Sequence, residues 1–334
     1  MADNENPIRF GIMGCAEIAR KVYRAIQMAP NSTLHAIASR SIDKARQFAV
    51  RNNLSKEVKL YGDYNELLND QFVDAIYMPL PTSLHLKWAV LAAQKGKHLL
   101  LEKPSALNVK DLDKILEACE SNGLQFMDGS MWYHHPRTAK MKDVLSNLEL
   151  FGQIKAIHSS SSYTGTPQFL ENDIRVKPDL DALGALGDAG WYCIGATLCA
   201  SLYWDEEKTV ATFYCSLISH ETMDLAVYGS NGTLHVEDFI IPYDESSATF
   251  SFTSGAKFLD LHIGWNVKPQ EVQVACQLPQ EATMIQEFST LVKGIKISRL
   301  RPDSKWSSST RSTQLVLDAV KNSIDIGFKP VQIY

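Results

Sequence analysis

The residues best suited to chemistry are Glu102, Lys103 and Pro104, which directly follow an apolar run at 99–101. Ligands of parallel sheets bind at the carboxyl ends of the strands. A lysine placed there could hold a cofactor ribose or a substrate hydroxyl and bias a proton transfer. The tripeptide alone has ordinary surface-loop composition, but it lies between a dinucleotide-type turn at Gly14 and a later glycine-rich segment. The bond before Pro104 could be cis, although most such bonds are trans.

A dinucleotide-binding turn is indicated by residues 11–19, which resemble the pattern G-x-G-x-x-G/A. Gly14 matches the first position and Ala19 the third, whereas Ala16 stands where a second glycine would let the backbone approach a pyrophosphate. The methyl group of Ala16 costs some approach distance. The N-terminus of the next helix still offers free N–H groups and a favourable dipole. The predicted cofactor contacts of this turn are Gly14, Cys15, Ala16, Glu17 and Ile18.

The end of the second predicted strand indicates which dinucleotide binds. An acidic residue there would bind the ribose hydroxyls of NAD, but this strand ends in Ser39 and Arg40, and Lys44 follows one helical turn later. A hydroxyl and a guanidinium suit a 2′-phosphate, because the guanidinium can bind it through two hydrogen bonds and stack on the adenine. A solvated loop arginine is the alternative interpretation. We predict NADP, with NAD less favoured.

The elements that must position these residues alternate between strand and helix up to about residue 129. The predicted strands are 8–13, 34–38, 73–78, 98–101 and 124–127, and the predicted helices are 18–26, 42–50, 84–95 and 109–121. This alternation is typical of a parallel, doubly wound sheet. The sequence therefore predicts an α/β Rossmann domain over residues 1–129, which would bind NADP.

The pattern changes in residues 130–334. After one helix at 136–148, segments with Ser/Thr alternation predict strands at 154–162, 209–218, 223–228, 233–236 and 248–253, and a last helix at 313–326. Ser230, Asn231 and Gly232 form a strong hairpin-turn signal. We therefore predict a C-terminal α+β domain with an open, mainly antiparallel sheet, used for substrate binding and dimerisation.

Composition excludes several classes of function. The 334-residue chain has a net charge of −5 and lacks the long Lys/Arg run of a nucleic-acid-binding protein. The acidic, polar opening predicts neither a signal nor a transit peptide, and apolar stretches are too short for a membrane partner. The six cysteines are scattered, without a CxxC pair or a histidine at metal-ligand spacing. This usage predicts a reducing compartment, the cytoplasm, and a protein without a bound metal.

Three segments together resemble the Gfo/Idh/MocA oxidoreductase family: 73–85 (VDAIYMPLPTSLH), Gly96-Lys97-His98 and Glu102-Lys103-Pro104. Within that family the chain is most similar to the plant branch allied to dimeric dihydrodiol dehydrogenase and NADP-dependent D-xylose dehydrogenase. The resemblance spans almost the whole chain. It implies a Rossmann domain followed by an open antiparallel sheet that makes substrate and dimer contacts. We therefore expect a homodimer formed through the C-terminal sheet.

The resemblance also implies site residues. Lys103 falls on the family's catalytic lysine, and the residues expected to line the cofactor are Leu80, Pro81, Thr82, His85 and Glu102. Residues 184–192 resemble the pattern G-G-x-x-x-D-x-G-x-Y, so Tyr192 falls on the proton donor of the dihydrodiol and glucose–fructose branches, where many other members carry histidine. A tyrosine with a pKa of about 10 is a poor base at neutral pH, and a lysine ammonium would favour its phenolate. Asp188, one helical turn before Tyr192, could orient a substrate hydroxyl or cap the helix.

Candidate substrate contacts follow the last predicted Rossmann strand, where the family's substrate pocket begins. Trp132, His134, His135 and Arg137 suit a polyol or a ring, although a packing role for the tryptophan is the alternative. Arg175, in the loop before the glycine-rich segment, is a further candidate contact.

One segment departs from the family pattern. After Ala200 the chain passes almost directly into the strand predicted at 209, where relatives have a longer stretch that adds a strand and a loop. We expect a shortened sheet with an exposed, unpaired edge. The leading hypothesis is an NADP-dependent oxidoreductase acting on a sugar, polyol or cyclic diol. A catalytically weak, NADP-binding regulatory or sensor protein is the alternative, and the shortened segment favours it.

Overall fold

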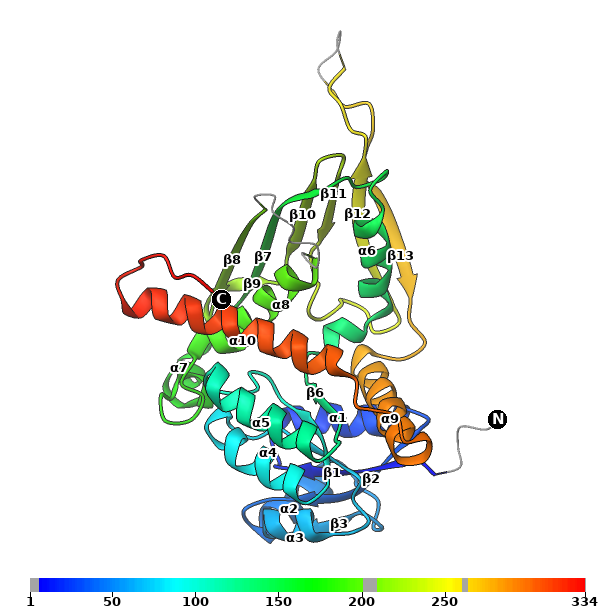
Figure 1. Ribbon diagram of the computed structural model, residues 1–334, viewed down its shortest axis with the longest axis vertical. Helices are drawn as coiled ribbons and strands as arrows, with labels where there is room; N and C mark the ends of the chain where they lie inside the picture. The colour runs from blue at the N-terminus through cyan, green and yellow to red at the C-terminus, as the bar shows by residue number, and fades with distance from the viewer. Residues whose placement is uncertain (1–5, 201–208, 260–263, 334) are drawn as a thin grey trace. The chain divides into compact units, whose positions relative to one another are not determined.

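The computed structural model describes residues 6–200, 209–259 and 264–333 (Figure 1). The described chain divides into two compact units. Unit 1 holds the described residues up to Ser130, the segment Ile174–Gly184 and the described residues from Glu281 onward, and unit 2 holds the described residues of Met131–Asp173 and Ala185–Gln280. The boundary expected after residue 129 lies beside the first crossing between the units. The segment Ile174–Gly184 and the C-terminal helices differ from that expectation, because they pack in unit 1.

Unit 1 is built on a parallel sheet, as predicted from the alternation of strands and helices. Among the described residues its six strands follow the order β3-β2-β1-β4-β5-β6, and every pair is parallel. The strands are β1 (Ile8–Met13), β2 (Ser32–Ala38), β3 (Lys59–Tyr61), β4 (Ala75–Met78), β5 (His98–Leu101) and β6 (Phe126–Asp128). The strand order reverses between β1 and β4, which is where ligands of doubly wound sheets bind. The predicted Rossmann fold is confirmed.

Helices connect and cover these strands. They are α1 (Glu17–Met28), α2 (Ile42–Arg51), α3 (Tyr64–Asn69), η1 (Thr82–Leu84), α4 (His85–Gln94), α5 (Val109–Ser121), η3 (Ile174–Val176), α9 (Gln280–Ser298) and α10 (Ser304–Asp325). Local capping explains where several begin: Asn108 accepts a hydrogen bond from the Asp111 N–H at the start of α5, and Asp303 does the same for Lys305 in α10. Strands β4 and β5 are buried along their whole length, which is why both read as continuous apolar runs.

The two C-terminal helices complete the core of unit 1. On α9, Phe288 packs against Phe10 of β1 with ring centroids 5.9 Å apart, and the Gln286 carbonyl accepts a hydrogen bond from the Asn31 side chain. At the start of α10, the side-chain amide of Gln125 donates to the carbonyl of Asp303 at 3.1 Å. Helix α9 is not predicted from the sequence, and α10 begins earlier than predicted. Strand β3 and helix α3 are not predicted either, because both are too short to show a periodic pattern.

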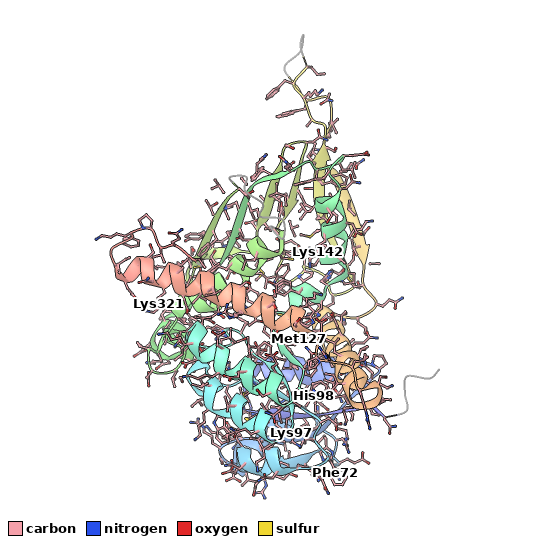
Figure 2. All side chains as sticks on the ribbon, viewed as in Figure 1. Phe72, Lys97, His98, Met127, Lys142 and Lys321 are labelled. Carbon is pink, nitrogen blue, oxygen red and sulfur yellow. The ribbon has the colours of Figure 1, made fainter. Side chains whose placement is uncertain are left out.

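Lys97 and His98 of the Gly-Lys-His motif lie at the start of β5 (Figure 2). Both side chains make structural contacts within unit 1. The buried Lys97 ammonium donates to the carbonyl oxygens of Asp70 and Val73, each at 2.7 Å. The His98 ring accepts a hydrogen bond from the Gln125 N–H at 3.0 Å, and burial lowers the pKa of His98 to about 4. These contacts tie β5 to its neighbours and fix the strand that directly precedes Glu102.

Unit 2 is built on an open, mainly antiparallel sheet, as predicted. Among the described residues the order is β13-β12-β11-β10-β7-β8, with β9 also paired to β7, and only β7 and β8 run parallel. The strands are β7 (Ile154–Thr164), β8 (Val210–Ser216), β9 (Ile218–Thr222), β10 (Leu225–Gly229), β11 (Gly232–Val236), β12 (Ser247–Ser254) and β13 (Gln270–Ala275). The helices are η2 (Met131–His134), α6 (Pro136–Ser146), α7 (Pro167–Asn172), the π-helix Leu186–Gly190 and α8 (Trp191–Ala200).

One turn and one strand predicted in this sheet differ in how well they match the structure. The turn at Ser230 and Asn231 joins the antiparallel strands β10 and β11, as predicted. The single strand predicted at 209–218 is instead divided at Leu217 between β8 and β9. The shortening predicted after Ala200 concerns residues 201–208, which lie outside the described residues. No helix among the described residues is both long and apolar enough to cross a membrane.

Candidate functional site

The turn after β1 requires the glycine at position 14. Gly14 has a φ of +121°, in the region that favours glycine, and a Cβ there would lie 3.0 Å from the Leu80 side chain and 3.3 Å from the Pro79 carbonyl oxygen. Its N–H donates to the Ala38 carbonyl at 2.9 Å. The turn after β1, the end of β2 and the loop after β4 therefore meet at Gly14, and the structure brings the predicted contacts Gly14 and Leu80 together.

The start of α1 fits a bound pyrophosphate. Ala16, the residue before the helix, has an extended backbone and no side-chain hydrogen bond to the first turn. Among the described residues the first N–H groups of α1 are thus not occupied by a side-chain cap and can donate to an anion. The carboxylate of Glu17 lies 3.8 Å from the Arg20 guanidinium, to which it forms an ion pair. The residues at this turn fit a dinucleotide.

The end of β2 carries the predicted phosphate contacts. Ser39 is buried, whereas Arg40 and Lys44 are exposed. Burial raises the pKa of the Cys15 thiol to about 11, although a hydrogen bond with Ser39 opposes that change. Cys15 therefore stays neutral at physiological pH, and it places no negative charge beside a phosphate.

The loop after β4 is held from another part of the chain. Thr82 donates both its N–H, at 3.1 Å, and its hydroxyl to the Asp181 carboxylate. The Ser83 N–H donates to the Leu180 carbonyl at 3.0 Å. The segment Ile174–Gly184, which also contains Arg175, thus fastens the loop that carries Leu80, Pro81 and Thr82.

His85, the fourth predicted contact of this loop, has a structural partner at each ring nitrogen. Nε2 lies 2.8 Å from the Leu80 carbonyl oxygen and Nδ1 lies 3.2 Å from that of Ser105. The ring is 1% exposed, and burial lowers the pKa of His85. A neutral imidazole donates only one of these hydrogen bonds at a time. His85 therefore joins the loop after β4 to the segment after Pro104.

The end of β5 presents Glu102 and Lys103, and the bond between Lys103 and Pro104 is cis. The Glu102 carboxylate accepts a hydrogen bond from the Tyr77 hydroxyl and one at 3.3 Å from the backbone N–H of Lys103. A Cβ at Gly129, directly after β6, would lie 3.0 Å from the Glu102 carboxyl group, so the backbone there packs against this side chain. Burial raises the pKa of Glu102, and the Tyr77 hydroxyl opposes that change.

A buried carboxylate, that of Asp128, lies at the end of β6. Asp128 accepts hydrogen bonds from the Ser130 N–H at 2.8 Å and from the Thr310 hydroxyl on α10. Together with Tyr77 on β4 and Glu102 after β5, it forms a row of polar groups along the carboxyl edge of three neighbouring strands. This is the edge at which ligands of parallel sheets bind.

In unit 2, Asp188 and Tyr192 have separate partners. Asp188 accepts a hydrogen bond from the Tyr163 hydroxyl at 2.8 Å, and the buried Tyr192 hydroxyl lies 3.7 Å from the sulfur of Met131. Residues 186–190 form a π-helix, which is wider than the α-helical turn assumed from the spacing of Asp188 and Tyr192. Single π-turns inside helices occur often at functional sites.

The candidate substrate contacts also lie in unit 2. His135 accepts a hydrogen bond from the Arg137 N–H at 2.9 Å through Nδ1, and its Nε2 lies 3.2 Å from the Cys276 sulfur. Burial and the Arg137 charge lower the pKa of His135 to about 4. Arg137 is itself buried and forms an ion pair with Asp238. Both side chains therefore have structural partners that the sequence did not indicate.

Trp132 and His134 belong to η2 and are buried. The Trp132 ring packs edge-on against Phe239, with centroids 5.6 Å apart, and lies beside Tyr133. Among the described residues its buried indole N–H has no acceptor.

Comparison with known proteins identifies the nucleotide-binding part of the chain. The sequence pattern of an oxidoreductase family with an NAD-binding Rossmann fold, Gfo/Idh/MocA, matches residues 8–130. These residues belong to the Gfo/Idh/MocA family. The family resemblance stated from the sequence is confirmed for this part of the chain, whereas the plant branch stays a prediction.

Two curated proteins with named activities are similar to part of this chain. A dTDP-3,4-didehydro-2,6-dideoxy-alpha-D-glucose 3-reductase from Actinomadura kijaniata is 34% identical over 69% of this chain and 65% of its own length. An NADP(+)-dependent D-xylose 1-dehydrogenase from Haloferax volcanii is 37% identical over 56% of this chain and 55% of its own. The chain thus spans about half to two thirds of the length of these curated relatives.

A solved structure resembles the chain over a greater length. It is a 3-ketoreductase from Actinomadura kijaniata in complex with NADP and TDP-benzene, with a TM-score of 0.77, 26% identity, and coverage of 95% of this chain and 98% of that one.

Sequence reasoning missed several residues that support the candidate site. Tyr77, Asp128 and Thr310 support the strand ends, and Asp181 holds the loop after β4. Tyr77 and Asp128 could have been found, since both lie at or beside the end of a predicted strand. Within the described residues, no group of three His, Cys, Asp or Glu side chains is placed to hold a metal ion.

Proposed function

We propose that the protein is an NADP-dependent oxidoreductase that transfers hydride between nicotinamide C4 and a carbinol carbon of a sugar, polyol or cyclic diol. The observation that carries this proposal is the arrangement of unit 1. The glycine turn after β1, the fastened loop after β4 and Lys103 after β5 follow neighbouring parallel strands at their carboxyl ends. The named activities of the sugar reductase and the xylose dehydrogenase support a substrate with a carbinol or keto carbon.

The choice of NADP is supported by the end of β2. Arg40 and Lys44 form no ion pair with a described carboxylate, and neither Ser39 nor Cys15 adds a negative charge there. We propose that Ser39, Arg40 and Lys44 bind the 2′-phosphate. The NADP in the similar ketoreductase structure agrees with this choice.

We propose that Tyr192 and Lys103 handle the hydroxyl proton. A bound nicotinamide would supply or accept the hydride. The Tyr192 phenol would give its proton to the carbonyl oxygen during reduction and take it from the carbinol during oxidation. A positive charge at Lys103 would favour the phenolate, and Asp188 would orient a substrate hydroxyl. These roles rest on the sequence resemblance, with Lys103 in unit 1 and Asp188 and Tyr192 in unit 2.

For the substrate contacts we propose Trp132, His134 and Arg175. The unpaired, buried indole N–H of Trp132 supports a role as donor to a substrate oxygen. The partners of His135 and Arg137 instead support a positioning role, in which they hold η2 and α6. We further propose a homodimer formed through the sheet of unit 2 and a cytoplasmic location.

A substrate screen tests this function. NADP+ reduction is followed by absorbance with pentoses, hexoses, inositols and trans-dihydrodiols, and NADPH oxidation with the corresponding keto sugars. Turnover with one class supports the oxidoreductase. Tight NADP binding without turnover across the panel supports the regulatory protein instead, and binding of neither NADP nor NAD contradicts both.

A further inference from the structure

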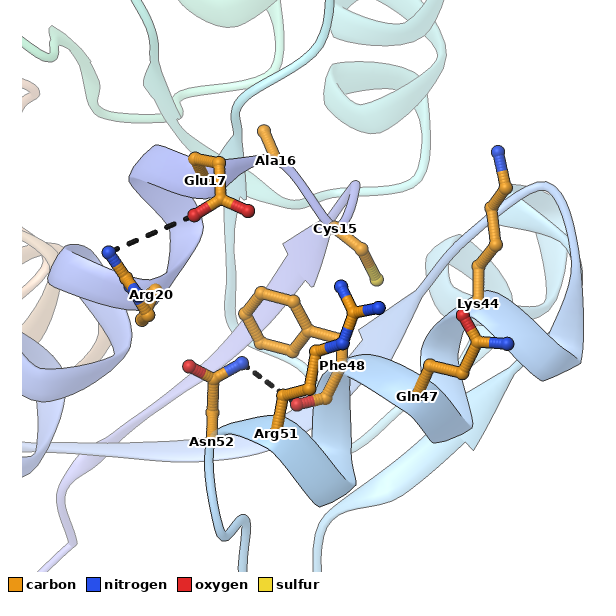
Figure 3. A pocket seen from close by; sticks show the side chains of 9 residues that line it. All are labelled: Cys15, Ala16, Glu17, Arg20, Lys44, Gln47, Phe48, Arg51 and Asn52. Carbon is orange, nitrogen blue, oxygen red and sulfur yellow. Dashed lines mark hydrogen bonds and ion pairs between the residues drawn. The ribbon is translucent and has the colours of Figure 1, made fainter.

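A hollow of about 290 Å³ lies beside the dinucleotide turn (Figure 3). It is bounded by the turn itself, by the first part of α1 and by one side of α2, and its lining residues are Cys15, Ala16, Glu17, Arg20, Lys44, Gln47, Phe48, Arg51 and Asn52. Lys44, Gln47 and Arg51 follow each other at the spacing that places helical residues on one face. Figure 3 shows the Lys44 and Arg51 side chains extending to the same side of α2, with the Arg51 guanidinium directed toward Cys15.

The positive charge in this hollow is not neutralised by neighbours. Three cationic side chains and one carboxylate line it, and that carboxylate, of Glu17, is paired with Arg20. Neither Lys44 nor Arg51 forms an ion pair with any described residue. Arg46 on the same helix, by contrast, lies 3.2 Å from Asp43. Unpaired cations on one face of a hollow attract an anion.

The shape and chemistry of the hollow favour an oxyanion. The buried Phe48 ring closes one side of the hollow. The neutral Cys15 thiol adds no repulsion. A guanidinium offers two parallel donors to a phosphate, an ammonium adds a compact charge, and the Gln47 amide is a neutral donor.

Two residues of the hollow are linked to the proposed 2′-phosphate contacts. Lys44 belongs to both groups of residues, and Cys15, which also lines the hollow, is hydrogen-bonded to Ser39. We propose that Lys44 and Arg51 bind a phosphate monoester dianion in this hollow. One source is the 2′-phosphate of the cofactor, in which case the inference rests on the proposed function and Arg51 determines cofactor choice. The other is a free phosphate compound.

Arg51→Gln tests the proposal, and Arg46→Gln is the matched control on the same helix. Calorimetric titrations of the full chain compare NADP, NAD, 2′,5′-ADP, 5′-AMP and inorganic phosphate. Because a hydrogen-bonded charge pair is lost, we expect Arg51→Gln, if the phosphate is that of the cofactor, to weaken 2′,5′-ADP and NADP about tenfold or more, with NAD changed less than about twofold. Arg51→Lys should recover part of the loss, and Arg46→Gln should change nothing. Thermal unfolding checks that each variant is folded.

Inorganic phosphate separates the two sources. If the phosphate is that of the cofactor, added phosphate competes with NADP but not with NAD. If it is a free compound, phosphate binds the NADP-loaded protein, and Arg51→Gln removes that binding. Either result supports the site. Unchanged binding of NADP, 2′,5′-ADP and phosphate in Arg51→Gln overturns the proposed phosphate site. If the wild type binds no dinucleotide, the proposed function is contradicted, and the phosphate titration alone then tests the site.

Discussion

Replacing Tyr77 by phenylalanine tests how the strand ends of unit 1 support cofactor binding. The Tyr77 side chain is fully buried, and its hydroxyl donates to the partly buried Glu102 carboxylate. A hydrogen bond to a charged group contributes about 1.5–3 kcal/mol, which corresponds to roughly a ten- to hundredfold shift between the ionised and neutral forms of Glu102. The sign follows from the loss of a donor: the pKa of Glu102 rises further above its ordinary value.

The assay is the pH dependence of NADP binding. We propose that the Glu102 carboxylate accepts a hydrogen bond from the cofactor ribose, in which case affinity falls as Glu102 becomes protonated. We expect the acidic limb of the binding curve to lie at higher pH in Tyr77→Phe than in the wild type, with similar affinity at high pH. Tyr23→Phe is the control, because the Tyr23 hydroxyl is paired with the Gln27 amide and not with a carboxylate. An acidic limb that does not move would refute the proposed link between Tyr77 and Glu102.

Three other substitutions test the site and its support. Tyr192→Phe should lower kcat by about 10²–10⁴-fold, the usual contribution of a general acid or base, with the Kd for NADP nearly unchanged; normal turnover would remove Tyr192 from the mechanism. Asp181→Ala removes the acceptor of both Thr82 hydrogen bonds. It should weaken NADP binding severalfold and speed proteolysis within Ile174–Gly184, and equal rates would count against this fastening role. For Asp74, burial raises the pKa, but hydrogen bonds from Arg9 and Lys296 outweigh it and hold the value at about 2. Because this lies below the unfolded value, the associated stability, about 2 kcal/mol, is present above pH 4 and lost as the pH falls toward 2. Urea unfolding at several pH values should show a smaller acid loss in Asp74→Asn, and parallel curves would contradict this.

Much of unit 1 is predictable because its strands are buried on both faces. The continuous apolar residues of β4 and β5 and the glycines that end their flanking helices are local signals. The short β3 and α3 are too brief to carry a periodic pattern. The return of Ile174–Gly184 to unit 1 depends on the contact of Asp181 with Thr82, which no pattern near either residue indicates.

Some residues of the candidate site can be predicted from the sequence and others cannot. Gly14 and Lys103 are recognisable because each follows a predicted strand directly. The partners of His135 and Arg137 are not recognisable, since Cys276 and Asp238 are distant in sequence and ordinary in type. The π-helix before Tyr192 cannot be predicted from regular helical spacing either, because the extra residue in its turn does not change the amino-acid composition.

The discontinuity of unit 1 has a consequence for how the protein is made. Phe288 on α9 packs on β1, and Thr310 on α10 donates a hydrogen bond to Asp128 at the end of β6. The strands of unit 1 are therefore synthesised first but cannot complete their packing until the last two helices have been synthesised. While unit 2 is being synthesised, the apolar surface that α9 will cover stays exposed. We therefore expect a chain that stops at Ser130 to be recovered aggregated or bound to chaperones, and the nascent protein to depend on them until synthesis ends.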